Sequence, residues 1–248
     1  MRLNELEIYL NQLLDVNHIQ DYCPNGLQVE GRSEVRKLVS GVTASFDFLQ
    51  AAVAAGADAV LVHHGYFWRG ENQCLTGRKR RRIALLIEND ISLFAYHLPL
   101  DVHLELGNNA QLGHRLGLIE TGRFGEQSIA AQGILPQAMT LKDFGKSIGQ
   151  LLSRSPLMIG DEKKIVHRIA WCTGAAQNYF DEAIQLGVDA FITGEISEQN
   201  VHAARESGVA FIAAGHHATE RYGVQALGEH LAQEFGIATQ FIDLDNPV

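Results

Sequence analysis

The sequence is poor in the features that mark secreted and membrane proteins. It contains three cysteines, Cys23, Cys74 and Cys172, and none of them forms a Cys-x-x-Cys pair. Such an odd and scattered set does not build a disulfide framework and fits a reducing compartment. No apolar run approaches the length of a membrane span, and the residues after Met1 lack the apolar segment of a signal peptide. We therefore expect a cytoplasmic protein that does not associate with membranes.

Positive charge is also scarce. The chain has 20 Lys and Arg against 29 Asp and Glu, a formal net charge of −9, which disfavours nucleic acid as a partner without excluding it. The exception is the basic run from Arg78 to Arg82. A solvated helix start is one interpretation of this run. The alternative is a contact with substrate phosphate, in which Arg78 would take part.

Two common catalytic signatures are missing as well. The sequence has no Gly-x-x-x-x-Gly-Lys-Ser/Thr phosphate loop and no Gly-x-Ser-x-Gly nucleophile elbow. Phosphate-loop nucleotide hydrolysis and serine-hydrolase chemistry therefore have no support in the sequence.

What is present is an alternation of apolar runs and stretches of helical periodicity, the order expected of parallel βαβ units in an α/β fold. The expected strands are residues 35–42, 58–62, 91–96, 127–134, 156–159, 169–174, 187–195, 208–214 and 238–244. The expected helices are residues 3–16, 45–55, 79–88, 108–116, 140–152, 177–186, 197–206 and 219–235.

The early part of this pattern recurs later in the chain. Gly56-Ala57-Asp58 matches Gly187-Val188-Asp189 at an offset of 187 − 56 = 131, and the next strand pair matches at an offset of 118. We favour an internal duplication as the explanation. The alternative is a chance similarity between two βαβ units. We predict two similar α/β halves, residues 1–125 and 126–248, with largely parallel sheets.

Potential metal ligands follow three of the predicted strands at their carboxyl ends. They are His63, His64, His97, Asp101, His216 and Glu220. Ligands of parallel α/β sheets bind beyond these strand ends, and neutral imidazole is the commonest protein metal ligand. A hydrogen-bonded structural role is the alternative for any single histidine. Several such groups at the strand ends of two matched halves instead predict a metal site.

The adjacent histidines raise a question of geometry. Neighbouring residues of an extended strand point to opposite faces, so His63 and His64 can serve one ion only if the backbone turns at Gly65. A pair of ions, bridged by a carboxylate, is the other solution. His217 could then orient Glu220 or a metal-bound water.

Three aromatic residues follow this histidine pair directly: Tyr66, Phe67 and Trp68. They would either pack the loop against the core or form the wall of a substrate pocket.

Seven short segments, some of them described above, together form a recognisable set of motifs. They are residues 24–29, 41–43, 56–58, 62–65, 97–101, 107–109 and 215–220. This set resembles the GTP cyclohydrolase 1 type 2 group, also called Ngg-interacting-factor-three-like proteins. The resemblance covers nearly the whole chain, and its two histidine motifs together are specific. The chain is too short in the middle to hold the central domain that is inserted in many members.

The resemblance implies a dinuclear metal site between two interlocked α/β halves, and assembly into a ring-shaped homohexamer. The implied ligands are His63, His64, Asp101, His216 and Glu220, with His97 close by. The family name refers to GTP, but a name shared by homology does not establish a substrate.

The predicted metal site is compatible with two functions, one catalytic and one not. We expect a dinuclear metal-dependent hydrolase that acts on a nucleotide or pterin-like heterocycle, with a metal-bridged hydroxide as nucleophile. Two divalent ions of Zn, Fe, Mn or Ni would suit the His and carboxylate ligands. The rival is a non-catalytic, metal-binding, ring-forming assembly protein that binds a protein or nucleic-acid partner.

Overall fold

The computed structural model describes residues 1–248 and shows a mixed α/β chain with two sheets, which confirms the predicted fold class. The chain forms two compact units. The first comprises Met1–Leu106 and Gly223–Asp245, and the second comprises Gly107–Tyr222 and Asn246–Val248. None of the helices combines the length and the apolar character that crossing a bilayer requires.

These units differ from the predicted halves, 1–125 and 126–248, in two places. Residues 107–125 belong to the second unit, and residues 223–245 return to the first. The return has a physical cause, because Val224, Leu227 and Leu231 are fully buried in the core of the first unit.

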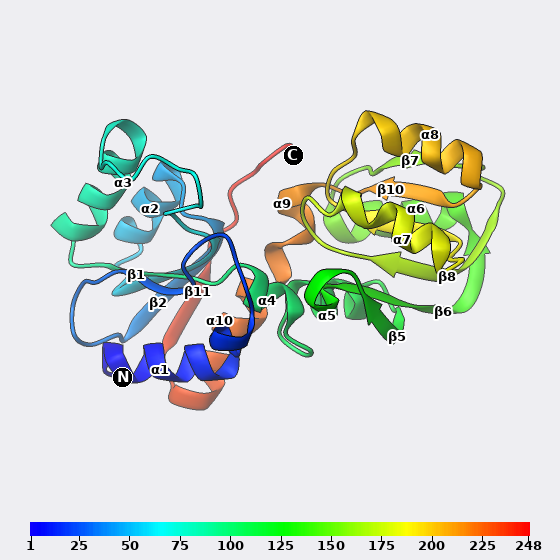
Figure 1. Ribbon diagram of the computed structural model, residues 1–248. Coiled ribbons are helices and arrows are strands. Elements are labelled where there is room, and N and C mark those ends of the chain that lie inside the picture. Colours follow the sequence, from blue (N-terminus) through cyan, green and yellow to red (C-terminus); the bar gives the residue numbers. More distant parts are fainter. The chain divides into compact units, whose positions relative to one another are not determined.

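The first unit is built on a five-stranded sheet with the order β1-β4-β3-β2-β11. Figure 1 labels β1, β2 and β11 of this sheet. Its strands are β1 (Gly26–Val29), β2 (Lys37–Thr43), β3 (Ala59–His64), β4 (Ser92–Ala95) and β11 (Ala238–Phe241). Its helices are α1 (Leu3–Leu13), η1 (Val16–His18), α2 (Phe46–Ala54), α3 (Gly77–Glu88), α4 (Leu98–Val102) and nearly all of α10 (Arg221–Phe235). All strand pairs are parallel except β1 with β4.

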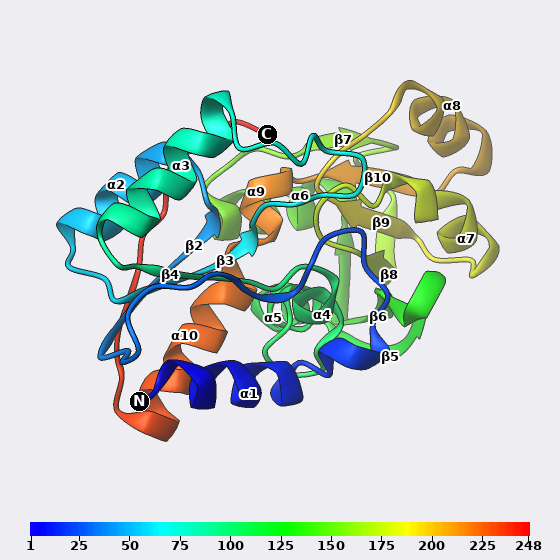
Figure 2. The ribbon, with the colours of Figure 1, turned by 60° about the vertical axis from the view of Figure 1, so that its left-hand side comes forward.

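Helices cover both faces of this sheet (Figure 2). On one face α1 and α10 bring Leu10 and Leu227 against Leu61 of β3. On the other face α2 brings Phe48 against Val60. Because successive residues of β3 enter different cores, this strand is buried from both sides. Its carboxyl end therefore has a well-defined position.

The second unit contains a six-stranded sheet with the order β5-β6-β8-β9-β10-β7. Its strands are β5 (Ile119–Phe124), β6 (Ala130–Thr140), β7 (Leu157–Ile159), β8 (Ile165–Trp171), β9 (Ala190–Thr193) and β10 (Ala210–Ala213). Its helices are α5 (Asn108–Arg115), η2 (Glu126–Ser128), α6 (Leu141–Leu152), η3 (Gln177–Tyr179), α7 (Phe180–Gln185), α8 (Glu198–Ser207) and α9 (His216–Thr219). Only β8, β9 and β10 pair in parallel, so this sheet is mixed.

The two βαβ regions share a hydrogen-bond pattern. Asp58 accepts bonds of 2.9 Å from both N–H groups of residues 36–37, at the start of β2. Asp189 accepts bonds of 2.9 and 2.8 Å from the N–H groups of residues 167–168 in β8. The aspartates and their donors are related by one offset, since 189 − 58 and 167 − 36 both equal 131. This is the offset found in the sequence, while the origin of the two halves by duplication stays a prediction.

Candidate metal centre

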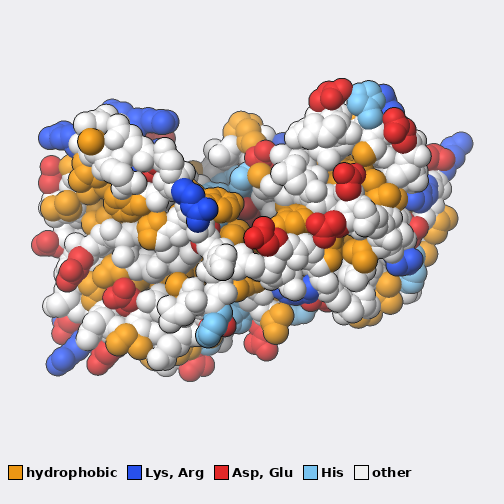
Figure 3. All heavy atoms as spheres, in the orientation of Figure 1, with side chains coloured by type: hydrophobic (Ala, Val, Ile, Leu, Met, Phe, Trp, Pro, Cys, Tyr) orange, Lys and Arg blue, Asp and Glu red, His pale blue; other side chains and the backbone are white.

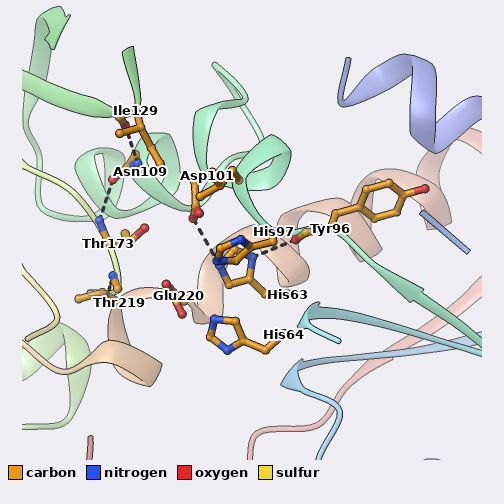
Figure 4. Close-up of polar contacts among 12 residues, drawn as sticks. His63, His64, Tyr96, His97, Asp101, Asn109, Ile129, Thr173, Thr219 and Glu220 are labelled. Carbon is orange, nitrogen blue, oxygen red and sulfur yellow. Dashed lines mark hydrogen bonds and ion pairs between the residues drawn. The ribbon is translucent and has the colours of Figure 1, made fainter. Parts of the chain in front are cut away.

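Three histidines of the first unit converge at the carboxyl ends of neighbouring strands (Figure 4). His63 and His64 end β3, and His97 follows β4. The ring centroid of His63 lies 4.6 Å from that of His64 and 5.0 Å from that of His97. One ligand atom from each histidine lies within 4.8 Å of the other two. The pair at the end of β3 thus faces a common point, with its rings tilted by 45°.

Asp101 approaches the same point from α4, a short helix that begins just after β4. Its Oδ1 lies 3.5 Å from Nε2 of His63 (Figure 4). His63 is fully buried and Asp101 is only 5% exposed. Buried imidazole and carboxylate groups of this kind are typically paired or coordinate a metal.

The histidines of β3 are oriented through Nδ1. His63 Nδ1 donates to the carbonyl of Tyr96 at 2.9 Å, and His64 Nδ1 lies 3.1 Å from the hydroxyl of Thr43. Because a carbonyl only accepts, the Nδ1 of His63 carries a proton, and the neutral ring then presents its lone pair at Nε2. Ligand histidines in metal sites are commonly held in this way.

Asp21 orients the third histidine and was not among the predicted site residues. Its carboxylate accepts bonds from His97 Nδ1 at 3.0 Å, from Asn25 at 2.9 Å and from the N–H of Leu98 at 2.9 Å. Burial alone would raise the pKa of Asp21, but these hydrogen bonds and the neighbouring His97 lower it to about 2. The fixed anion holds the His97 proton on Nδ1.

Cys23 lies beside this pair, with Asp21 and His97 as close neighbours. Burial first, and then the carboxylates of Asp21 and Asp101, raise the pKa of its thiol well above the usual range. Metals bind the thiolate form of cysteine. The thiol of Cys23 is therefore protonated in the metal-free protein.

The second unit contributes a carboxylate–histidine–carboxylate arrangement. His216 opens α9, and its Nε2 lies 3.1 Å from Oε2 of Glu220. Its Nδ1 bonds to Oε1 of Glu195 at 2.6 Å. Burial lowers the pKa of His216, but the two carboxylates outweigh it and raise the pKa to about 9. Glu195 was also missed in the sequence, where it follows β9 without any motif.

Two glycines make room for this arrangement. A Cβ on Gly174, whose φ is +69°, would meet the Glu220 carboxylate and would lie 3.3 Å from Nε2 of His216. A Cβ on Gly194 would lie 2.6 Å from Cα of His216. Larger residues at either position would displace the candidate ligands.

The other predicted site residues lie in varied surroundings. Tyr66 is 4% exposed, and its hydroxyl donates to the carbonyl of Ala44. Trp68 is half-buried and lies near the histidines. Arg78 is exposed in α3, over which Lys and Arg side chains gather (Figure 3). The backbone N–H of His217 donates to the carbonyl of Val248, and the role predicted for its side chain stays a prediction.

The predicted ligands thus form two groups, one in each unit. His63, His64, His97 and Asp101 belong to the first, and His216 and Glu220 belong to the second. Both groups offer the nitrogen and oxygen donors that borderline divalent metals bind. Their combination into one dinuclear centre stays a prediction.

Comparison with known proteins agrees with the motifs. Residues 1–247 match the family described as Duf34/NIF3 (NGG1p interacting factor 3). The chain belongs to this family. A relative from Pseudomonas aeruginosa, named GTP cyclohydrolase 1 type 2 homolog, is 58% identical over 242 residues, which cover 96% of this chain and 95% of that protein. A relative of the same name from Escherichia coli is 50% identical over the full length of both chains.

Several solved structures share the fold. A structure described as "protein ybgI, unknown function" has a TM-score of 0.96 at 49% identity and covers 100% of both chains. A protein from Thermus thermophilus has a TM-score of 0.90 at 33% identity, again with full coverage. HcgD from Methanocaldococcus jannaschii, at 21% identity, shows the fold alone, with a TM-score of 0.83 over 99% of this chain and 98% of that one.

Proposed function

We propose that this member of the Duf34/NIF3 family is a dinuclear metal-dependent hydrolase that acts on a nucleotide or pterin-like heterocycle. The observation that carries the proposal is the orientation of the histidines. His63, His97 and His216 are each held at Nδ1 by an oxygen acceptor, so that Nε2 is directed to other partners. The name shared by the curated relatives, GTP cyclohydrolase 1 type 2 homolog, agrees with this class of reaction.

The proposed ligands of the two ions are His63, His64, Asp101, His216 and Glu220. Bound divalent ions supply Lewis-acid polarisation of the substrate and activation of water. Within the chain, Asp21 keeps the Nδ1 proton of His97 in place. The Nε2 atom of His97 can then serve as a further ligand or accept a proton during hydrolysis.

Metal content tests the first half of this proposal. The protein would be purified without chelators and without added metal, and its metals would be counted by mass spectrometry. We expect two divalent ions per chain, with a clear loss in Glu220→Gln. The control is Glu229→Gln, which alters an exposed carboxylate of α10. A wild-type protein without metal would contradict the dinuclear site.

Turnover tests the second half. The metal-loaded protein would be incubated with a panel of nucleotides and pterins, and products would be followed by chromatography. We expect ring or phosphate hydrolysis that disappears in His64→Ala. Activity that survives this change would come from another site. Bound metal without any turnover, in a chain that light scattering shows to be a hexamer, would favour the non-catalytic assembly protein instead.

A further inference from the structure

Two aromatic side chains lie beside the histidines of the first unit. The ring centroid of Trp68 lies 5.0 Å from that of His97, with the planes at 87°, and 6.1 Å from that of His64. Tyr22 lies 5.8 Å from Trp68 and 5.1 Å from His97. Tyr22 and Trp68 are 46 positions apart in the sequence (68 − 22), so the fold rather than a motif brings them together.

These rings are more open to solvent than the histidines next to them. Tyr22 is 49% exposed and Trp68 is partly exposed, whereas His63 is fully buried. A half-exposed tyrosine beside a tryptophan offers π-surface to a ligand. The other two aromatic residues of the loop differ, because Tyr66 is buried and Phe67 packs against the core.

The loop that carries Trp68 is held firmly. The side-chain amide of Gln28 accepts from the N–H of Tyr66 at 2.7 Å and donates to its carbonyl at 3.1 Å. Phe67 then adopts a φ of +68°, an uncommon conformation for a bulky residue. Its N–H donates to Glu71 at 3.1 Å, which stabilises this conformation. Strained backbone of this kind concentrates at ligand sites.

A further contact connects the loop to Tyr22. The N–H of Arg69 donates to the carbonyl of Tyr22 at 2.7 Å, and the Arg69 guanidinium donates to the carbonyl of Asp21 at 3.2 Å. The backbone segments that carry the two rings are therefore joined directly. Ordered rings lose little conformational entropy when a ligand binds.

We propose that Tyr22 and Trp68 form an aromatic platform that binds the planar ring of a nucleobase-like heterocycle beside His64 and His97. The inference rests on the proposed function, since it names the substrate class of the same site and the side chains that recognise it. Stacking suits such a ring because every base has a π-face, and it works without base-specific hydrogen bonds. The polar edge of the stacked ring would face the histidines.

Binding to the metal-loaded protein tests the platform without requiring turnover. Guanosine 5′-monophosphate is the probe, and ribose 5-phosphate is the matched compound without a ring. Equilibrium dialysis gives the affinity, and tryptophan fluorescence reports on the site. The chain has two tryptophans, and Trp171 is 1% exposed in the core of the second unit. Quenching by the nucleotide should therefore come from Trp68.

The variants separate stacking from general structural effects. We expect Trp68→Leu to weaken nucleotide binding by about ten-fold or more, Tyr22→Leu to weaken it by a similar factor, and Trp68→Phe to restore most of the loss. Ribose 5-phosphate should neither quench the fluorescence nor distinguish wild type from variants. Metal content and thermal midpoint, measured on the same samples, should match the wild type.

Two results would overturn the platform. One is equal nucleotide affinity in wild type and Trp68→Leu, and the other is no nucleotide binding to wild type at millimolar concentration. Choline is included because a cation could also bind the π-faces, and preferential choline binding would overturn the heterocycle assignment. Failure of the proposed function is distinguishable, because it would appear as absent turnover while the ring-dependent binding to the metal-loaded protein persists.

Discussion

At the scale of single residues, two carboxylate–histidine pairs are the feature that the units share. Asp21 accepts from Nδ1 of His97, and Glu195 bonds to Nδ1 of His216. In each unit a second carboxylate stands four residues after the histidine, at Asp101 or at Glu220. Sequence spacing reveals the second carboxylate but not the first, because Asp21 lies 76 residues from its histidine.

Removing these orienting carboxylates should weaken metal binding without removing a ligand. We expect Glu195→Gln and Asp21→Asn each to lower the affinity for a divalent ion by about 10- to 100-fold, the usual effect of losing such a partner. Titration calorimetry on metal-free protein would measure it. Glu198→Gln is the control, since this carboxylate pairs with His202 on the surface and is 82% exposed. Unchanged affinity in both variants would contradict the orienting role.

A glycine next to the histidines gives a second test at this scale. A Cβ on Gly65 would meet the Gln28 amide oxygen and would lie 2.5 Å from Cβ of Ala95. Gly65→Ala should therefore destabilise the protein by about 1–3 kcal/mol, as overpacking does. Gly228→Ala is the matched control in helix α10, because its Cβ would lie 3.5 Å from Ser40 Oγ. There alanine should be neutral or stabilising by up to about 1 kcal/mol. Urea denaturation would compare the two, and equal effects would argue against this explanation.

At the scale of helices and strands, the sequence predicted the elements that have a clear hydrophobic periodicity. Strands β2, β3 and β4 and their helices lie close to the expected ranges, because buried strands and amphipathic helices have strong patterns. Strands β1 and β5 were missed. Both lie at sheet edges, and β1 has only four residues. Their pairing depends on tertiary contacts, as in the antiparallel match of Leu27 with Phe94. The short helix α4, which carries Asp101, was also missed, because its 5 residues are too few to show a helical period.

Asp58 and Asp189, which directly precede β3 and β9, allow a prediction about how the strands are held together. Burial would raise the pKa of Asp58, but the N–H groups of residues 36–37 and the Arg32 guanidinium lower it below its usual value. The folded-state pKa is therefore below the unfolded one. The ionised group stabilises the fold fully above about pH 4, and this contribution is lost as the pH falls through the folded-state pKa.

We expect Asp58→Asn to lower the free energy of unfolding by about 1 kcal/mol at pH 7. Urea titrations between pH 7 and pH 3 should show wild type and variant converging at the acidic end. Asp189→Asn, which removes the equivalent acceptor in the second unit, should cause a similar loss at pH 7. A difference between Asp58→Asn and wild type that stays constant with pH would contradict the role of the charge.

At the scale of the whole molecule, the sequence shows a pattern that recurs at an offset of 131 residues, but it does not show which unit the end of the chain joins. The periodicity of residues 219–235 predicted a helix, and α10 is that helix. Periodicity does not specify which sheet a helix covers. Leu227 and Leu231 are buried with Leu61 and Phe94 of the first sheet, and β11 then pairs with β2. The first unit is thus completed by residues more than 100 positions away, a long-range choice that local patterns do not contain.

The contribution of bound metal to the folding stability of the whole chain can be tested by chelation. A ligand that binds only the folded state stabilises it by about 2.7 kcal/mol at a free concentration 100 times its Kd. For a chain of this size, each kcal/mol corresponds to roughly 2–4 °C in Tm. We therefore expect chelation to lower the Tm by about 5–10 °C and added metal to restore it, as measured by calorimetry. In Glu220→Gln, which removes a proposed ligand, the response to chelator should be much smaller. A wild-type protein that loses its metal without any change in Tm would show that the ions, although bound, contribute nothing to folding stability.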